Sequence, residues 1–384
     1  MIGRGSLAVV AVLLVPALAA CSIGDVRRPP PHRPSASPRP APTAPVPTRA
    51  VGFDEVRQVR VAVPPRYDRP NVEFVDAAHG YALFAACDGV PPGRGCAALL
   101  YATVDGGRSW RALRHPRPVA ANQQLYAVPE ALVLLSEPYG WYTSTDGGAS
   151  FAHTTGGEPA ALVAAGGRYQ IVEARGVIGE WDGRRLVPLA AQPSVPGLNT
   201  VGHDGDLLVA AGARDGRPYA AISRNRGRSW LATPVPAIDG EVGVLRVVLA
   251  PDGGVWLVGE RSDRTGFPAL WRLVDTRSWE PARAAGHPAQ ALSVAPIGVG
   301  LLAVTGPDGV GVVAGGRYYH VDWPLTGDHY LTVLADGTIA ARGPDDVILG
   351  TGWTANRRWI KVILDGDRPA GCRSVTTAEP SRSC

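Results

Sequence analysis

Short runs of apolar and β-branched residues, separated by turn residues, recur along most of the chain. In the first unit these runs are Val72–Phe74, Gly80–Ala85, Ala97–Thr103 and Arg111–Leu113. Apolar runs of a few residues between Gly, Pro, Asp and Asn predict short strands rather than helices. Four such runs in sequence predict one four-stranded antiparallel sheet.

The turn before the last strand of this unit is repeated. Thr103-Val-Asp-Gly-Gly-Arg-Ser-Trp110 recurs as Ser144-Thr-Asp-Gly-Gly-Ala-Ser-Phe151 and as Ser223-Arg-Asn-Arg-Gly-Arg-Ser-Trp230. Weaker copies end at Leu186, Trp279, Tyr319 and Trp359. The seven copies lie about 41 residues apart, a period typical of β-propeller blades. The sequence therefore predicts an all-β fold, a seven-bladed β-propeller of four-stranded antiparallel blades.

The repeated turn resembles the Asp-box, or bacterial neuraminidase repeat, of sialidases, sortilin-type receptors and photosystem II assembly factors. In such a turn the Asp bonds nearby amides, Gly supplies a positive φ and the aromatic residue packs between blades. The resemblance implies a structural role, remote from the ligand-binding face, for the matching residues. These are Asp105, Gly107, Trp110, Asp146, Gly148, Phe151, Asn225, Gly227 and Trp230.

The composition agrees with a turn-rich fold, and the charge argues against a nucleic-acid partner. The 384 residues include 47 Gly and 36 Pro, and the formal net charge is +4. Six Arg and one acidic residue lie in residues 1–50, so residues 51–384 carry 32 basic and 33 acidic residues. Nucleic-acid binding depends on neutralising phosphates with a basic surface, and we therefore expect no nucleic-acid partner.

The N-terminus predicts export and anchoring. Arg4 precedes an apolar run, Leu7–Ala20, that is too short to span a bilayer but suits a secretory signal. Leu18-Ala-Ala-Cys21 resembles the bacterial lipoprotein signal, which implies that residues 1–20 are removed and that Cys21 is lipidated. The alternative is an ordinary signal peptide with an incidental Cys. The expected location is the extracytoplasmic face of the bacterial cell membrane, held by the lipid anchor.

Residues 21–50 comprise this lipidated Cys and a tether without aromatic residues. Nine Pro and five Arg lie in residues 22–50, a composition that predicts a disordered, extended spacer about 90 Å long. Residues 51–364 then form the propeller, and residues 365–384 a C-terminal tail. Which unit pairs with Val56–Val63 to close the ring is left open by the sequence.

Four further cysteines fit an exported protein with disulfides. Cys87 ends one predicted strand and Cys96 begins the next, so a bridge between them would join the hairpin. Cys372 and Cys384 would then pair in the tail. Bridges between the first unit and the tail, or free thiols, remain alternatives.

The connection between the second and third strands of each blade faces away from the boxes, on the side where ligands usually bind. These connections are rich in Arg and carboxylates, which could recognise a polar ligand. The candidates are Arg94, Glu137, Tyr139, Glu173, Arg175, Arg214, Asp215, Arg217, Glu260, Arg261, Asp263, Arg264, Asp308, Arg342, Asp345 and Asp346, with Asp88 beside them.

No catalytic residues, metal site or cofactor are predicted. A sialidase would need an Arg triad, a Tyr activated by Glu and an acidic residue, and Arg66-Tyr-Asp-Arg-Pro70 departs from the Phe/Tyr-Arg-Ile-Pro sequence that opens that family's first blade. We predict a monomeric, non-catalytic recognition module for an extracytoplasmic protein, peptide or glycan. The alternatives are a sialidase-like glycoside hydrolase and an assembly factor for a membrane protein complex.

Overall fold

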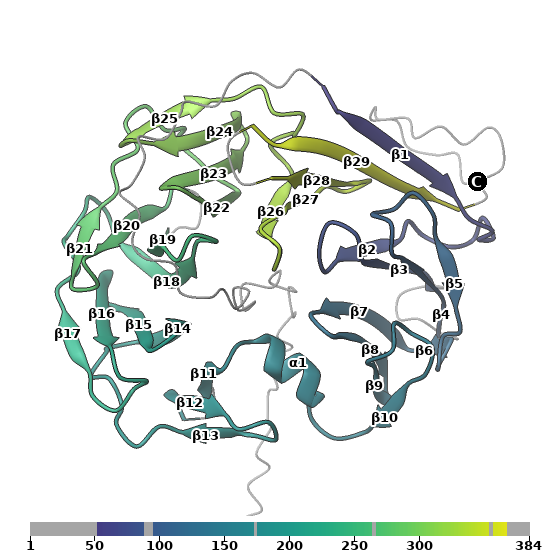
Figure 1. The fold of residues 1–384 in the computed structure, drawn as a ribbon, viewed down its shortest axis with the longest axis horizontal. Helices are drawn as coiled ribbons and strands as arrows, with labels where there is room; N and C mark the ends of the chain where they lie inside the picture. Colours follow the sequence, from purple (N-terminus) through teal and green to yellow (C-terminus); the bar gives the residue numbers. More distant parts are fainter. Residues whose placement is uncertain (1–51, 88–94, 173–174, 263–265, 353–355, 367–384) are drawn as a thin grey trace, which may run out of the picture.

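The computed structural model describes residues 52–87, 95–172, 175–262, 266–352 and 356–366. Its strands form seven sheets arranged as blades around a central axis (Figure 1). The seven-bladed propeller predicted from the repeat is therefore confirmed. No helix in the described residues is long and apolar enough to cross a membrane.

Four blades have the predicted four strands, which pair in chain order from the axis outward. Blade 2 contains β7 (Asn122–Val128), β8 (Ala131–Glu137), β9 (Gly140–Ser144) and β10 (Ala152–Thr154). Blade 4 contains β14 (Leu198–Asp204), β15 (Leu207–Arg214), β16 (Arg217–Ser223) and β17 (Leu231–Thr233). Blade 5 contains β18 (Val242–Leu249), β19 (Val255–Arg261), β20 (Ala269–Val274) and β21 (Ser278–Pro281). Blade 6 contains β22 (Ser293–Gly298), β23 (Leu301–Gly306), β24 (Gly309–Ala314) and β25 (Arg317–His320).

Blade 1 has the expected four strands and a short extra one. It contains β2 (Asn71–Phe74), β3 (Gly80–Cys87), β4 (Cys96–Thr103), β5 (Arg111–Leu113) and β6 (Val119–Ala120). Both β5 and β6 pair antiparallel with β4, at different places along it. The outer strand of this blade is thus interrupted after Leu113 and resumes beside Cys96 and Ala97, at the start of β4.

Blade 3 departs from the prediction because it has three strands. They are β11 (Tyr169–Val172), β12 (Val177–Trp181) and β13 (Leu186–Pro188). The box-like turn joins β12 to β13, which makes β11 the second strand of the pattern and leaves the innermost strand missing. At this point of the chain a short helix, α1 (Ala160–Ala165), forms instead and lies beside blade 3 (Figure 1). Leu162 of this helix packs against the small buried core on blade 2.

The ring closes in blade 7. It contains β26 (Tyr330–Val333), β27 (Ile339–Arg342), β28 (Val347–Thr351) and β29 (Arg358–Asp365), and β1 (Glu55–Arg60) pairs parallel with β29 as a fifth strand. The N-terminal segment therefore pairs with the last unit, and the last blade has four strands without it.

Side chains of β1 connect this last blade to the first. Arg57 is buried and donates a hydrogen bond to the carbonyl oxygen of Gly106 in the first box, with an N–O distance of 2.7 Å. The Glu55 carboxylate accepts hydrogen bonds from Arg57, from Arg108 beside the same box and from Arg358 of β29. The hydrogen bond from Arg57 lowers the pKa of Glu55 to about 2. Blades 7 and 1 are thus held together by a charged cluster around one carboxylate.

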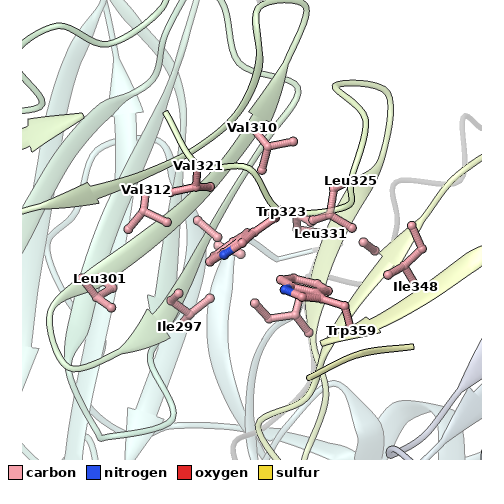
Figure 2. Packing of buried hydrophobic residues seen from close by; sticks show 14 of the residues in the cluster. Ile297, Leu301, Val310, Val312, Val321, Trp323, Leu325, Leu331, Ile348 and Trp359 are labelled. Carbon is pink, nitrogen blue, oxygen red and sulfur yellow. The ribbon is translucent and has the colours of Figure 1, made fainter. Parts of the chain in front are cut away.

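Apolar residues of neighbouring blades pack together between them. The largest such core lies between blades 6 and 7, where the Trp323 and Trp359 rings are 5.0 Å apart between centroids (Figure 2). Ile297 and Val312 of blade 6 and Ile348 of blade 7 complete the same cluster. Burial of such side chains is the main favourable contribution to folding.

A disulfide joins Cys87 to Cys96 across β3 and β4, at the end of blade 1 opposite the box. This pairing was one of those that the sequence left open. Cys372 and Cys384 lie outside the described residues, so the second bridge stays a prediction.

Candidate ligand-binding face

The alternation of strand direction sorts the connections onto two faces. In blades 1, 2 and 4 the box connects the third strand to the fourth, so the loop between the second and third strands lies at the opposite end of the blade. We call the end with the boxes the box face and the opposite end the ligand face. Each described candidate residue lies in, or at the edge of, a connection on the ligand face.

The first box has the hydrogen bonds expected of a structural turn. Asp105 accepts bonds from the amide and the hydroxyl of Ser109, with distances of 2.9 and 2.6 Å, and one from the hydroxyl of Thr103. The amide of Gly107 donates to the Thr103 hydroxyl at 2.8 Å. Burial raises the pKa of Asp105, but these hydrogen bonds outweigh that effect and lower it to about 2. The equivalent bonds form in the second box, which uses Ser144, Asp146, Gly148 and Ser150.

The third box shows that the turn does not require a charge. Asn225 replaces Asp, yet its Oδ1 accepts bonds from the Ser223 hydroxyl and the Ser229 amide at 2.9 and 3.0 Å. Its Nδ2 donates to the Ser229 hydroxyl at 2.9 Å, whereas in the other boxes that hydroxyl donates to a carboxylate. The same turn thus forms with one hydrogen bond reversed.

Box residues also pack against the preceding blade. Gly107 has φ +89, and a Cβ there would lie 2.6 Å from Cγ1 of Val362 in blade 7, so the position needs Gly. The glycines of the second and third boxes have the same relation to Leu113 and Leu189. The glycines of the three boxes therefore lie where each blade packs against the preceding one.

The aromatic residues after the boxes pack between blades. Trp110 contacts the buried cores shared by blades 7 and 1 and meets Phe74 edge-on, with ring centroids 6.2 Å apart. Trp279 and Trp359 are buried at the equivalent places in blades 5 and 7. In blade 6, however, the residue that faces the preceding blade is Tyr318 rather than Tyr319, because successive side chains of a strand point to opposite faces.

Several candidates on the ligand face are engaged within the protein. Arg342 forms an ion pair with Glu73 at 3.5 Å, and Glu260 forms one with Arg246 at 3.0 Å. Arg261 donates to the carbonyl oxygens of Asp239 and Phe267. Asp345 forms an ion pair with Arg69. These residues hold neighbouring segments in place, and Arg342, Glu260 and Asp345 have their charges paired within the protein.

Asp346 belongs to a cluster in blade 7 that the sequence did not reveal. Its carboxylate lies 3.0 Å from Nε2 of His329 and 2.6 Å from Nζ of Lys361, the only lysine of the chain. The amide of Thr326 donates to Nδ1 of His329, which assigns the ring proton to Nε2. Burial raises the pKa of Asp346, but the hydrogen bonds from His329 and Lys361 bring it below its ordinary value.

The remaining described candidates are exposed and without ion pairs to other described residues. The basic ones, Arg175, Arg214 and Arg217, lie on the adjacent blades 3 and 4 (Figure 1). Asp215, which has φ +52, turns the hairpin between the two basic residues of blade 4. Asp308 and Glu137 are exposed on blades 6 and 2. Asp88, Arg94, Glu173, Asp263 and Arg264 lie outside the described residues.

Tyr139 has a partner that sequence reasoning missed. The Arg117 guanidinium lies over its ring, 3.5 Å from the centroid, and His153 bonds its carbonyl oxygen at 2.7 Å. Val119, from the same segment as Arg117, is 49% exposed beside the disulfide. The Pro-rich sequence His115-Pro-Arg-Pro118 between two strands was a signal for a structured ligand-face segment here.

The described residues do not form the sialidase constellation. Three Arg side chains converge on Glu55, which is a carboxylate of the protein itself on the box side of β1. Tyr169 lies near Glu180, but burial raises the pKa of its phenol, the opposite of an activated nucleophile. In the described residues no three His, Cys, Asp or Glu side chains are placed to hold a metal ion.

Comparison with known proteins assigns no family to this chain. No protein-family model matches the chain, and no curated protein does. Among solved structures it is similar to YCF48 from Cyanidioschyzon merolae, with 15% identity, 76% of this chain and 94% of that chain covered and a TM-score of 0.41. It is also similar to YCF48 bound to D1 peptide, with 15% identity, coverage of 79% and 83% and a TM-score of 0.29. For the GH74 xyloglucanase from Xanthomonas campestris the identity is 18%, the coverage 75% and 46%, and the TM-score 0.29.

Proposed function

We propose that this chain is a lipid-anchored, extracytoplasmic propeller that recognises an acidic segment of another polypeptide on its ligand face and catalyses no reaction. An assembly factor for a membrane protein complex would be one form of this function, with the polypeptide as a subunit of that complex.

One observation carries the proposal. Several charged residues of the ligand face are paired within the protein, whereas Arg175, Arg214 and Arg217 are exposed on two adjacent blades without ion pairs to other described residues. Asp215 is the one described candidate acid on these two blades, and Glu137 and Asp308 are exposed on other blades. Exposed guanidinium groups bind carboxylates through charge-assisted hydrogen bonds and steer acidic partners toward the surface. A neutral glycan would gain nothing from this charge, so we favour a polypeptide ligand.

The anchor completes the proposal. Lipidation of Cys21 would hold the propeller at the membrane through the Pro-rich tether, within reach of exported proteins. Replacing Cys21 with Ser should release the protein from the membrane fraction into the medium. A Cys21→Ser protein that remains in washed membranes would contradict the anchor.

A sialidase-like hydrolase is the alternative from another class. It predicts turnover of a fluorogenic sialic-acid glycoside by the purified protein, lost when ligand-face Arg residues are replaced. We expect no turnover, because the Tyr that lies near a Glu, Tyr169, has a pKa that burial raises, the opposite of an activated nucleophile.

Photo-cross-linking in living cells tests recognition itself. Amine-directed reagents are a poor choice because Lys361 is the only lysine and already pairs with Asp346. A photoreactive residue placed at Asp308 or Arg214 should give a discrete cross-linked product, whereas one placed at exposed Thr145 on the box face should not. Equal labelling from both faces, or none from the ligand face, would refute the proposal.

A further inference from the structure

Blade 3 stops one strand short of the axis. In the other six sheets an innermost strand occupies this place, whereas the blade 3 sheet begins with the second strand, β11. The missing width is that of one strand, about 4.8 Å. The inner edge of β11 is thus an open sheet edge near the centre of the molecule (Figure 1).

The hydrogen-bonding register shows which groups point toward this open place. The amide of Trp181 bonds the carbonyl oxygen of Arg168, so alternate residues Gln170 and Val172 direct their backbone groups toward β12. The amides and carbonyls of Tyr169 and Ile171 therefore point away from β12, toward the axis. Within the described residues no backbone or side-chain hydrogen bond to these groups of Ile171 is found.

In blades 2, 5 and 7 an amide of the innermost strand donates a hydrogen bond to a side chain of the preceding blade. Glu73 of blade 1 accepts a hydrogen bond from the amide of Ala127 in blade 2, at 2.8 Å. Thr200 of blade 4 accepts one from Val247 of blade 5, at 3.2 Å. Ser293 of blade 6 bonds Leu331 of blade 7 in the same way.

Between blades 2 and 3 the polar side chains of β7 bond residues of blades 1 and 2 instead. Gln123 of β7 accepts a bond from Ser136 and donates to the carbonyl oxygen of Arg117, and Gln124 accepts one from Tyr126. Neither side chain has a hydrogen bond to β11 in the described structure. Among the described residues, the edge of β11 therefore lacks the side-chain hydrogen bond that blades 2, 5 and 7 form with the preceding blade.

Helix α1 flanks this edge without adding to the sheet. Gln170 donates hydrogen bonds from its side chain to the carbonyl oxygens of Val163 and Gly167, which holds the end of the helix beside β11. The helix has six residues, none fully buried, and no side chain caps its N-terminus. Such a short helix is marginal by itself and depends on its packing.

We propose that an extended, acidic segment of a partner polypeptide adds to β11 as the missing innermost strand of blade 3. A peptide backbone is the ligand whose donors and acceptors match the spacing of an open strand edge. The acidic character follows from Arg175, at the ligand-face end of this blade, and from exposed Arg214 and Arg217 of the next. The inference rests on the proposed function and assigns its site.

An Ile171→Pro substitution tests this site selectively. Proline removes the Ile171 amide hydrogen, which faces the open edge, and leaves the bonds of Gln170 and Val172 to β12. Ile171→Val keeps the amide and serves as the matched control. Random peptides displayed on phage are selected on the full chain, purified with detergent, and their affinities are then measured for both variants.

We expect selected peptides rich in β-branched and acidic residues, with about tenfold or greater loss of affinity for Ile171→Pro and little change for Ile171→Val. If the proline variant does not fold, hydrogen–deuterium exchange of the Ile171 amide in the unsubstituted protein provides the test, because a bound strand should slow this exchange.

Peptides that bind equally to Ile171→Pro, or leave this exchange unchanged, would overturn the site while leaving recognition intact. A library that yields no binder would overturn both. A dimer that Ile171→Pro converts to a monomer would assign the edge to a second copy instead.

Discussion

Arg57 of the N-terminal strand donates a hydrogen bond to the carbonyl oxygen of Gly106, 2.7 Å away, in the box turn of the first blade. Because that strand pairs with β29 of the last blade, this contact is one of those that connect the two ends of the ring. Propeller closure here depends on a side chain in addition to the backbone pairing of β1.

The first prediction concerns this closure. Arg57→Ala should lower the free energy of unfolding by about 2 kcal/mol, because a buried charged donor is lost. Arg60→Ala, on the same strand but exposed, should change it by less than about 0.5 kcal/mol. Urea unfolding measures both, and equal effects of the two substitutions would show that closure does not depend on Arg57.

Glu55 should make closure sensitive to acid. The hydrogen bond from Arg57 lowers its pKa from 4.5 to about 2, so its contribution to stability is complete above about pH 4.5 and is lost as the pH falls toward 2. Glu55→Gln should be less stable than the unsubstituted protein at pH 7, and the difference should shrink between pH 4.5 and 2. A difference that stays constant over this range would contradict the assignment.

Substitutions of Asp105 separate the contribution of its negative charge to stability from that of its hydrogen bonds. Asp105→Ala removes acceptors from Thr103 and Ser109 and should cost about 1–2 kcal/mol. Asp105→Asn should cost clearly less, because Asn225 already forms the same turn in the third box. Thermal unfolding of the two variants provides the measurement, and an Asn variant as unstable as the Ala variant would mean that the first box needs the carboxylate charge.

The disulfide of blade 1 should stabilise the fold. Replacing Cys87 and Cys96 together with Ala removes a cross-link that closes a short loop, and we expect a loss of about 2–3 kcal/mol. Peptide mapping under non-reducing conditions should recover this pair from the unsubstituted protein. Recovery of either residue joined to the C-terminal tail would contradict the pairing.

Much of the fold could be predicted because the repeat combines a local turn with a fixed period. The box needs only neighbouring residues, such as Thr103, Asp105 and Ser109, so its structure can be read from eight positions. Blade 3 was predicted wrongly because its repeat was counted by the box-like turn, and Asp182–Arg185 kept that turn while the first strand was absent. The sequence Pro159-Ala-Ala-Leu-Val-Ala-Ala165 was a helix signal in its place.

The candidate site was less predictable because its contacts join distant residues. Arg342 and Glu73 are 269 positions apart, so no sequence pattern shows that the Arg is already paired. The same holds for His329, Asp346 and Lys361. The loops of the ligand face could be located from strand order, but only the structure separates their paired charges from the exposed ones.

Charge reversal on the two faces tests the central claim most directly. Arg214→Glu/Arg217→Glu changes the ligand face, and Arg184→Glu/Arg185→Glu makes the same change in charge on the box face of blade 3, where both residues are exposed. Each full-length variant is used to capture proteins from solubilised cell envelopes, with quantification by mass spectrometry. The account predicts that a specific captured protein is lost with the ligand-face variant and retained with the box-face variant. The same captured proteins from both variants and the unsubstituted protein would contradict recognition at the ligand face.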